Sequence, residues 1–311
     1  TVGTLLFTSV FYAGLAGLLS GGLLYAILLG ARCCQAAVMS ATSPAPAAYD
    51  ADHTTQDQRI RAMARLGTAN SMGTILGPAV SGALAALGLL APLYFAAGLA
   101  AAAALLIWWQ LPLTPPRDLT RRHSSTHLRY TDPRIVTYLA TSVGLFVGYS
   151  GIQQTLGFQL QDKLALDGIE TAQMTGAALM VSAAFTFIVQ MTVMQRLNLR
   201  PIQFMRFGLA ALLAGSVIIC GFSSFALLAP GMACLGAGLG LCMPAIYSGA
   251  SLAVTPEEQG GAAGLVSACP AIGFVAGPLC AGALYQIDGL LAPLFSATVF
   301  ALVLALLMFR E

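Results

Sequence analysis

The chain has 311 residues, of which 58% are hydrophobic and only 8% are charged, whereas globular chains are typically about 45 to 50% apolar and about 25% charged. This composition excludes a soluble protein with a single membrane tail, because too few polar residues remain to cover a water-exposed surface. The net charge of +2 comes from 14 basic and 12 acidic residues, which is too balanced for a nucleic-acid-binding surface. We therefore expect a chain embedded in lipid, without a nucleic-acid partner.

Apolar runs that could cross a bilayer recur along the whole chain. A spanning helix needs about 20 apolar residues, and these runs are apolar all round, whereas barrel strands alternate apolar and polar residues. The runs predict ten helices, at residues 1–17, 22–48, 64–87, 91–111, 135–157, 171–195, 204–222, 225–252, 261–284 and 291–309. The expected fold class is all-α, a polytopic membrane helical bundle.

The basic residues fall mainly on one side of such a bundle. When the connections are numbered alternately, one side holds Arg59, Arg61, Arg65, Arg117, Arg121, Arg122, Arg129, Arg134, Arg196, Arg200, Arg206 and Arg310. Lys163 lies on the opposite side, and Arg32 lies inside a span. Because basic connections stay in the cytoplasm, we expect this side and the C-terminus to be cytoplasmic, in the inner membrane.

A repeat divides the chain into two related halves. Residues 73–84 read GTILGPAVSGAL, and residues 273–284 read GFVAGPLCAGAL, a shift of 200 positions. The polar stretch 112–133 reads as a cytoplasmic linker, so that 1–111 and 134–311 form the halves. The second half contains six predicted spans and the first contains four, so we expect that about two helices are missing before Thr1. A parallel repeat of six-helix units is the plan of twelve-helix transporters.

The repeated element has two interpretations. Its glycines and prolines are Gly73, Gly77, Pro78 and Gly82 in the first half, and Gly273, Gly277, Pro278 and Gly282 in the second. Glycines four residues apart let another helix approach closely, which alone could explain them. A proline after the second glycine removes a helical hydrogen bond and bends the axis. The recurrence of the entire pattern at a constant shift favours a shared functional bend.

Three segments carry a resemblance to a known family. Residues 73–82, GTILGPAVSG, resemble gxxxGPxxGG, the antiporter motif on the fifth helix of exporters of the major facilitator superfamily. Residues 32–36, RCCQA, resemble the fourth-helix motif RxxqG. Residues 48–52, AYDAD, followed by Arg59 and Arg61, are similar to the AYxAD…R.RA stretch of tetracycline and multidrug exporters. The GxLaDrxGrk loop between the second and third helices of the family is absent.

The resemblance implies a twelve-helix carrier whose fourth, seventh and tenth helices line a central cavity. By helix order, the candidate substrate-binding residues are Arg32, Gln35, Met39, Tyr149, Gln153, Met243 and Tyr247. Arg32 lies near mid-bilayer, where a charge is costly unless it faces partners or water. It either lines a solvated cavity or is satisfied by snorkelling or by carbonyl groups. The polar residues of the later spans either contact substrate or form hydrogen bonds between helices.

Ionisable residues needed for coupling are scarce. The predicted spans contain no Asp or Glu, although proton coupling normally needs a titratable group. Asp50, Asp52, Arg59 and Arg61 lie at the expected cytoplasmic edge, where they form either a gate-like charge cluster or a solvated helix end. A proton carrier, if the protein has one, would lie in the missing helices.

These features together predict a transporter. We expect a monomeric secondary carrier that exports a drug or metabolite by alternating access, with proton as the coupling ion; export is implied by the resemblance alone. The alternative is an uptake symporter for a small anionic solute, with Arg32 as its ligand. An enzyme is not expected, because no cluster of nucleophile, base or metal ligands is visible. No cofactor is expected either, and a non-transporting receptor remains a further alternative.

Overall fold

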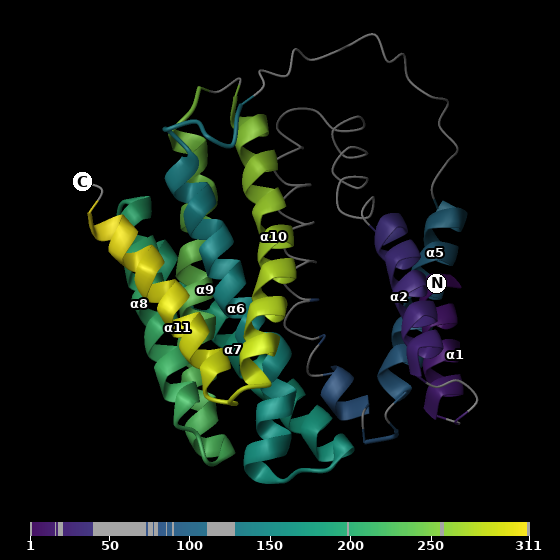
Figure 1. Cartoon of the computed structure of the whole chain (residues 1–311). Helices are drawn as coiled ribbons and strands as arrows, with labels where there is room; N and C mark the ends of the chain where they lie inside the picture. Colours follow the sequence, from purple (N-terminus) through teal and green to yellow (C-terminus); the bar gives the residue numbers. More distant parts are fainter. Residues whose placement is uncertain are drawn as a thin grey trace. The chain divides into compact units, whose positions relative to one another are not determined.

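The chain divides into two compact units, Thr1–Arg117 and Asp118–Glu311, shown in Figure 1. The structure is a computed structural model that describes residues 2–15, 17, 21–39, 73, 77, 80–84, 86–88, 90–110, 128–197, 199–255 and 258–309. The point of division falls inside the stretch 112–133 that was predicted as a linker.

All of the secondary structure described is helical. The first unit contains α1 (Val2–Leu15), α2 (Gly21–Met39) and α5 (Ala91–Gln110). The second contains α6 (Val136–Leu164), α7 (Gly168–Arg196), α8 (Pro201–Cys220), α9 (Phe225–Leu252), α10 (Gln259–Tyr285) and α11 (Leu291–Met308). Of the predicted span 64–87, residues 73, 77 and 80–84 are helical, and most of the others lie outside the described residues. The all-α bundle is confirmed.

Most of the described helices are suited to a bilayer. Seven of them, α2, α5 and α7 to α11, are long and apolar enough to cross a membrane. Helix α1 is apolar but shorter. Helix α6 has 29 residues and is not among the seven, because its sequence contains more polar residues. It continues to Leu164, beyond the end predicted at residue 157. Helix α6 is therefore the long helix of the second unit that is least matched to lipid.

The turn between α6 and α7 shows how local sequence sets the helix ends. Ala165 adopts the left-handed conformation, with φ of 52°, which reverses the chain after α6. The Oδ1 atom of Asp167 then accepts a hydrogen bond from the backbone N–H of Glu170 at 2.7 Å, while the Glu170 carboxylate accepts from the Asp167 N–H. This capping box satisfies N–H groups at the start of α7 that have no partner within the helix.

The sequence repeat is visible in the packing of each unit. In the first unit α1 contacts α2 and α5, and in the second α8 contacts α9 and α11. Helix α5 begins at residue 91 and α11 at residue 291, in agreement with the shift of 200 positions. The two halves therefore share a helix order and a pattern of neighbours.

The tightest helix contact in the repeated element joins α10 to α6, which lie side by side in Figure 1. A Cβ atom added to Gly273 would lie 2.3 Å from the Cβ of Phe146, and one added to Gly277 would lie 2.4 Å from the carbonyl oxygen of Val147. The hydroxyl of Ser150 donates a hydrogen bond to the Gly273 carbonyl at 2.9 Å. Gly273 and Gly277 are needed because backbone touches backbone here.

The remaining members of the element behave differently. A Cβ atom added to Gly282 would meet nothing within 4 Å. Helix α10 continues through Pro278, so this proline does not end it. Gly73, Gly77 and Gly82 are helical in the first unit, and Pro78 lies outside the described residues. Within the repeated element of the second unit, close packing thus depends on Gly273 and Gly277. The functional bend remains a prediction.

Enlarging the glycine contact should destabilise the second unit. We expect Gly277→Ala to lower the free energy of unfolding by about 1 to 3 kcal/mol, because the added methyl group overpacks a backbone contact. Gly282→Ala on the same helix is the matched control, and it should be neutral or slightly stabilising because alanine favours a helix. Thermal unfolding of the purified protein in detergent measures both. Equal melting temperatures for the two variants would contradict the close contact.

Candidate functional site

Arg32, the charge predicted to lie inside a span, is an exposed residue of α2. Its Nη1 atom donates a hydrogen bond to Oε1 of Gln35 at 2.8 Å, and Nε2 of Gln35 donates to Oγ1 of Thr4 at 2.9 Å. The guanidinium carbon lies 5.4 Å from the centroid of the Phe7 ring, within range of a cation–π contact. Sequence analysis gave Arg32 and Gln35 as candidates on one helix, and the structure shows that they form a hydrogen bond. It missed Thr4 and Phe7, which lie on a neighbouring helix.

The charge of Arg32 has no acidic partner in the part of the chain that the structure describes, where the salt bridges all involve Arg134. Arg32 lies 11 residues after the first residue of α2, which is about 16 Å along the helix axis. A cation at such depth costs at least about 2.5 kcal/mol. Met39, the third candidate on α2, is exposed and is the last residue of the helix.

Two further candidates lie on α6. Tyr149 is partly buried and packs against the core, with its hydroxyl facing Ser182 of α7. The Oε1 atom of Gln153, one turn further along, is buried and has no hydrogen-bond partner among the described residues. The same holds for Oγ1 of Thr175, which faces Gly157 across the two helices. Hydroxyl groups of both helices, those of Tyr149 and Thr175 among them, therefore lie between α6 and α7.

The last two candidates lie on α9. Met243 packs against the core, and the Tyr247 hydroxyl lies 3.2 Å from the hydroxyl of Ser267 on α10. Ser267 donates its own hydrogen to the carbonyl of Ala263 at 2.7 Å, so Tyr247 is the donor to Ser267. Tyr247 lies five residues before Leu252, the last residue of α9.

The candidates fall into separate groups. Arg32, Gln35 and Met39 belong to the first unit, and the four on α6 and α9 belong to the second. The predicted gate residues Asp50, Asp52, Arg59 and Arg61 lie outside the described residues. Within the described part of the chain, no group of three or more His, Cys, Asp or Glu side chains could hold a metal ion.

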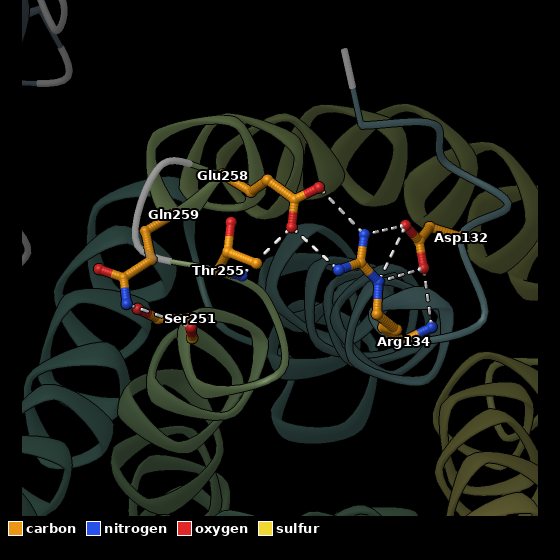
Figure 2. A network of polar contacts seen from close by, with 6 residues as sticks. All are labelled: Asp132, Arg134, Ser251, Thr255, Glu258 and Gln259. Atoms are coloured by element: carbon orange, nitrogen blue, oxygen red, sulfur yellow. Dashed lines mark hydrogen bonds and ion pairs between the residues drawn. The ribbon is translucent and has the colours of Figure 1, made fainter. Parts of the chain in front are cut away.

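A charge network that sequence reasoning missed joins the starts of α6 and α10 (Figure 2). The guanidinium of Arg134 donates to Glu258 through Nη1 at 2.9 Å and through Nη2 at 3.2 Å. It also donates through Nη2 to Asp132 at 2.8 Å. Arginine suits this position because its planar fork can bind two carboxylates at once.

Both carboxylates also serve the helix ends near which they lie. Asp132 Oδ1 accepts from the backbone N–H of Arg134 at 2.9 Å, and Glu258 Oε2 accepts from the backbone N–H of Thr255 at 3.1 Å. Each helix start carries about half a positive charge, so two adjacent starts repel each other. The network carries a net charge of −1 and offsets this repulsion. We name Asp132, Arg134 and Glu258 the helix-start network.

The network alters the acid–base behaviour of its members. Hydrogen bonds from Arg134 lower the pKa of Asp132 below its ordinary value and lower the pKa of Glu258 in the same way. The two carboxylates raise the pKa of Arg134 in turn. All three groups therefore stay ionised at neutral pH.

The opposite end of α6 is held by a second pair of contacts. The hydroxyl of Tyr285, the last residue of α10, donates a hydrogen bond to the Asp162 carboxylate. Lys163 donates to the carbonyl of Cys220 at 3.0 Å, and its Nζ atom lies 4.3 Å from the centroid of the Phe222 ring. Asp162 and Lys163 thus bind the end of α6 to α10 and to the end of α8.

Removing Arg134 should give a destabilisation that depends on pH. A carboxylate whose pKa is lowered in the folded state stabilises that state at pH values above the ordinary carboxyl pKa. This contribution is lost as the pH falls through the pKa of the folded state. We expect Arg134→Gln to lower the melting temperature at about pH 7, with a difference from wild type that shrinks below about pH 4.

Thermal unfolding in detergent across this pH range measures the effect. Arg196→Gln, at an exposed position at the end of α7, is the matched control for loss of one positive charge. A difference between Arg134→Gln and wild type that stays constant with pH would show that packing, rather than the carboxylates, is responsible.

Comparisons with known proteins agree with this architecture. The chain is similar to the crystal structure of the human organic anion transporter MFSD10 (TETRAN), with 21% identity and a TM-score of 0.62 over 98% of this chain and 75% of that one. It is also similar to a bacterial homolog of the human lysosomal transporter Spinster in its inward-facing, occupied conformation, with 14% identity and a TM-score of 0.65 over 99% and 80%. At these levels of identity, the similarity shows that the fold is shared. No curated protein sequence matches the chain significantly.

The sequence profile of one family covers the whole chain, in matches to residues 1–269 and 193–311. The solved structures to which its fold is similar are those of membrane transporters. The chain belongs to the Major Facilitator Superfamily.

Proposed function

We propose that the protein is a secondary active transporter that exports a small molecule across the inner membrane by alternating access. The observation that carries export is the segment 73–82, GTILGPAVSG, which resembles the antiporter motif of exporters in this family. Its counterpart in the second unit packs α10 against α6 through Gly273 and Gly277. We further propose that the coupling ion is the proton and that the monomer is the working unit.

The candidate residues supply the binding groups of this proposal. Arg32 and Gln35 offer a charged and an amide group in the first unit, and Tyr149, Gln153, Met243 and Tyr247 offer polar and polarisable groups in the second. Asp50, Asp52, Arg59 and Arg61 would form a cytoplasmic gate, on the side of the membrane where the basic connections predict the C-terminus.

An uptake symporter for a small anionic solute is the second candidate. The unpaired charge of Arg32 favours it, since no acidic residue contacts Arg32 among the residues described. MFSD10, to which the fold is similar, is an organic anion transporter. An anionic solute is compatible with either direction, so only the direction separates the two candidates.

Accumulation of a fluorescent anion in cells separates export from uptake. We expect cells that produce the full-length protein to hold severalfold less fluorescein than cells that produce Arg32→Ala, because the arginine supplies substrate affinity. Arg196→Gln, produced at the same level, should behave like wild type. A protonophore should abolish the difference if protons drive export. Higher internal fluorescein with the wild-type protein would establish uptake instead.

A further inference from the structure

The second unit is electronegative at the end opposite the helix-start network. Helices α6, α8 and α10 end there and α7, α9 and α11 begin there, joined by residues 165–167, 221–224 and 286–290, all of which the structure describes. The charged residues at this end are Asp162, Lys163, Asp167, Glu170 and Asp288. Four acids and one base give a net charge of −3, and such a field attracts cations.

Asp162 is placed differently from the other three acids. Asp167 and Glu170 form the capping box at the start of α7, and Asp288 accepts a hydrogen bond from a backbone N–H just before α11. A helix start favours a carboxylate, whereas a helix end carries about half a negative charge and disfavours one. Asp162 lies near the last residues of α6 and contacts Tyr285, the last residue of α10. Its position therefore calls for a positive partner.

No side chain of the described part of the chain supplies that positive charge. The salt bridges found there all involve Arg134, at the other end of α6. Lys163, next to Asp162 in the sequence, donates instead to the carbonyl of Cys220 at 3.0 Å. The Asp162 carboxylate accepts a hydrogen bond from the neutral hydroxyl of Tyr285, and a carboxylate has about four acceptor sites. Room for a further ligand remains.

A buried amide oxygen lies one turn before Asp162. Gln159 is 1% exposed, and its Nε2 atom donates to Oγ1 of Thr155 at 3.2 Å. Its Oε1 atom is buried and has no hydrogen-bond partner among the described residues, which is unfavourable. Residues three apart on a helix share a face, with Cβ atoms about 5 to 6 Å apart. One small ligand between the two side chains can therefore reach both.

Both groups lie near the end of α10. The parallel helices α6 and α10 meet where a Cβ atom added to Gly151 would lie 3.1 Å from the Cβ of Ala281. Gln159, eight residues after Gly151, is then level with residue 289, just beyond the last residue of α10. The negative end of the α10 dipole therefore points toward the level of Gln159 and Asp162.

These groups define the chemistry of the ligand. Carboxylate and amide oxygens are the ligands that hard cations prefer. A divalent ion is usually held by more than one carboxylate, whereas here one carboxylate is joined by neutral oxygens. A monovalent cation matches this charge.

We propose that the Asp162 carboxylate and Oε1 of Gln159 bind a sodium ion at the ends of α6 and α10, and that Tyr285 is the positioning residue for Asp162. The ion neutralises the carboxylate and gives the buried amide oxygen its partner. This inference goes beyond the proposed function and does not depend on it, because the ion is assigned to the helix ends whether or not a solute is transported.

Binding of radioactive sodium to the purified full-length protein in a neutral detergent tests the site, with choline chloride keeping the ionic strength constant. We expect saturable binding of one ion per chain. The melting temperature should be higher in sodium than in choline by about 2 to 4 °C, since a ligand stabilises the state that binds it. If neither saturable binding nor this difference is seen, the proposal is overturned and Gln159 binds water only.

Variants separate the site from the general field of this end. Asp162→Asn should abolish saturable binding, and in choline it should melt no lower than wild type, because a negative charge leaves the helix ends. Gln159→Leu should weaken binding severalfold, and Gln159→Glu, which keeps an oxygen, should retain it. Tyr285→Phe leaves every charge in place and should also weaken binding severalfold, which keeps the proposal testable if Asp162→Asn does not fold.

Asp288→Asn is the matched control, because it removes an acid of the same end that caps α11. It should bind sodium as the wild-type protein does. Equal losses in Asp288→Asn and Asp162→Asn would show a diffuse attraction and refute the site. Displacement of sodium by calcium at lower concentration than by unlabelled sodium would reveal a divalent-cation site and overturn the assignment. Absence of solute flux in proteoliposomes would refute transport and leave the sodium site in place.

Discussion

The contact between α6 and α10 is the constraint on which the second unit depends. Two glycines bring the helix backbones together, and the helix-start network and the Tyr285–Asp162 hydrogen bond hold the two ends. The helices run in the same direction, so their like dipole ends lie together and need the carboxylates that are found there. We expect a helix pair that is held at its middle and at both ends to move as one body.

Helix α6 combines this anchoring with a polar sequence. Glycines also bring it close to α11, where the ring of Phe300 occupies the space beside Gly148. Because its neighbours hold it so firmly, the helix can carry groups that lipid would reject, such as Gln159, which is 1% exposed and donates to Thr155. Its amide and hydroxyl groups, Gln153 among them, lie where hydrogen-bond partners are scarce. Tight packing of α6 against α10 and α11 thus allows the same helix to carry buried polar groups without hydrogen-bond partners.

Sequence patterns predicted those features that depend on neighbours along the chain. The span 225–252 agrees with α9 to the residue, because polar and turn residues bound the apolar run on both sides. Helix α6 was predicted to end at residue 157, before the polar residues Gln159, Asp162 and Lys163. Each is accommodated through a contact within the bundle, the last two through partners 123 and 57 residues away. Hydropathy contains no information on such partners.

The candidate site shows the same division. The bond between Arg32 and Gln35 follows from helical spacing, whereas Phe7 and Thr4 become neighbours only through packing of α1 on α2. The helix-start network joins residues 124 positions apart. Local signals for it did exist. Residues 255–258 read TPEE, which has the spacing of a capping box, and Asp132 precedes a proline just before a span. These signals locate two polar turns before helices, without indicating that one arginine joins them.

The two tyrosine candidates of the second unit lie at different depths along their helices. Tyr149 lies 13 residues after the start of α6, and Tyr247 lies five residues before the end of α9. Both counts begin at the same face of the unit, because Arg134 joins the start of α6 to the start of α10, the helix that follows α9. At about 1.5 Å per residue the two tyrosines differ by about 12 Å in depth. If the protein transports a solute shorter than this interval, as we propose, the solute would contact the two tyrosines one after the other.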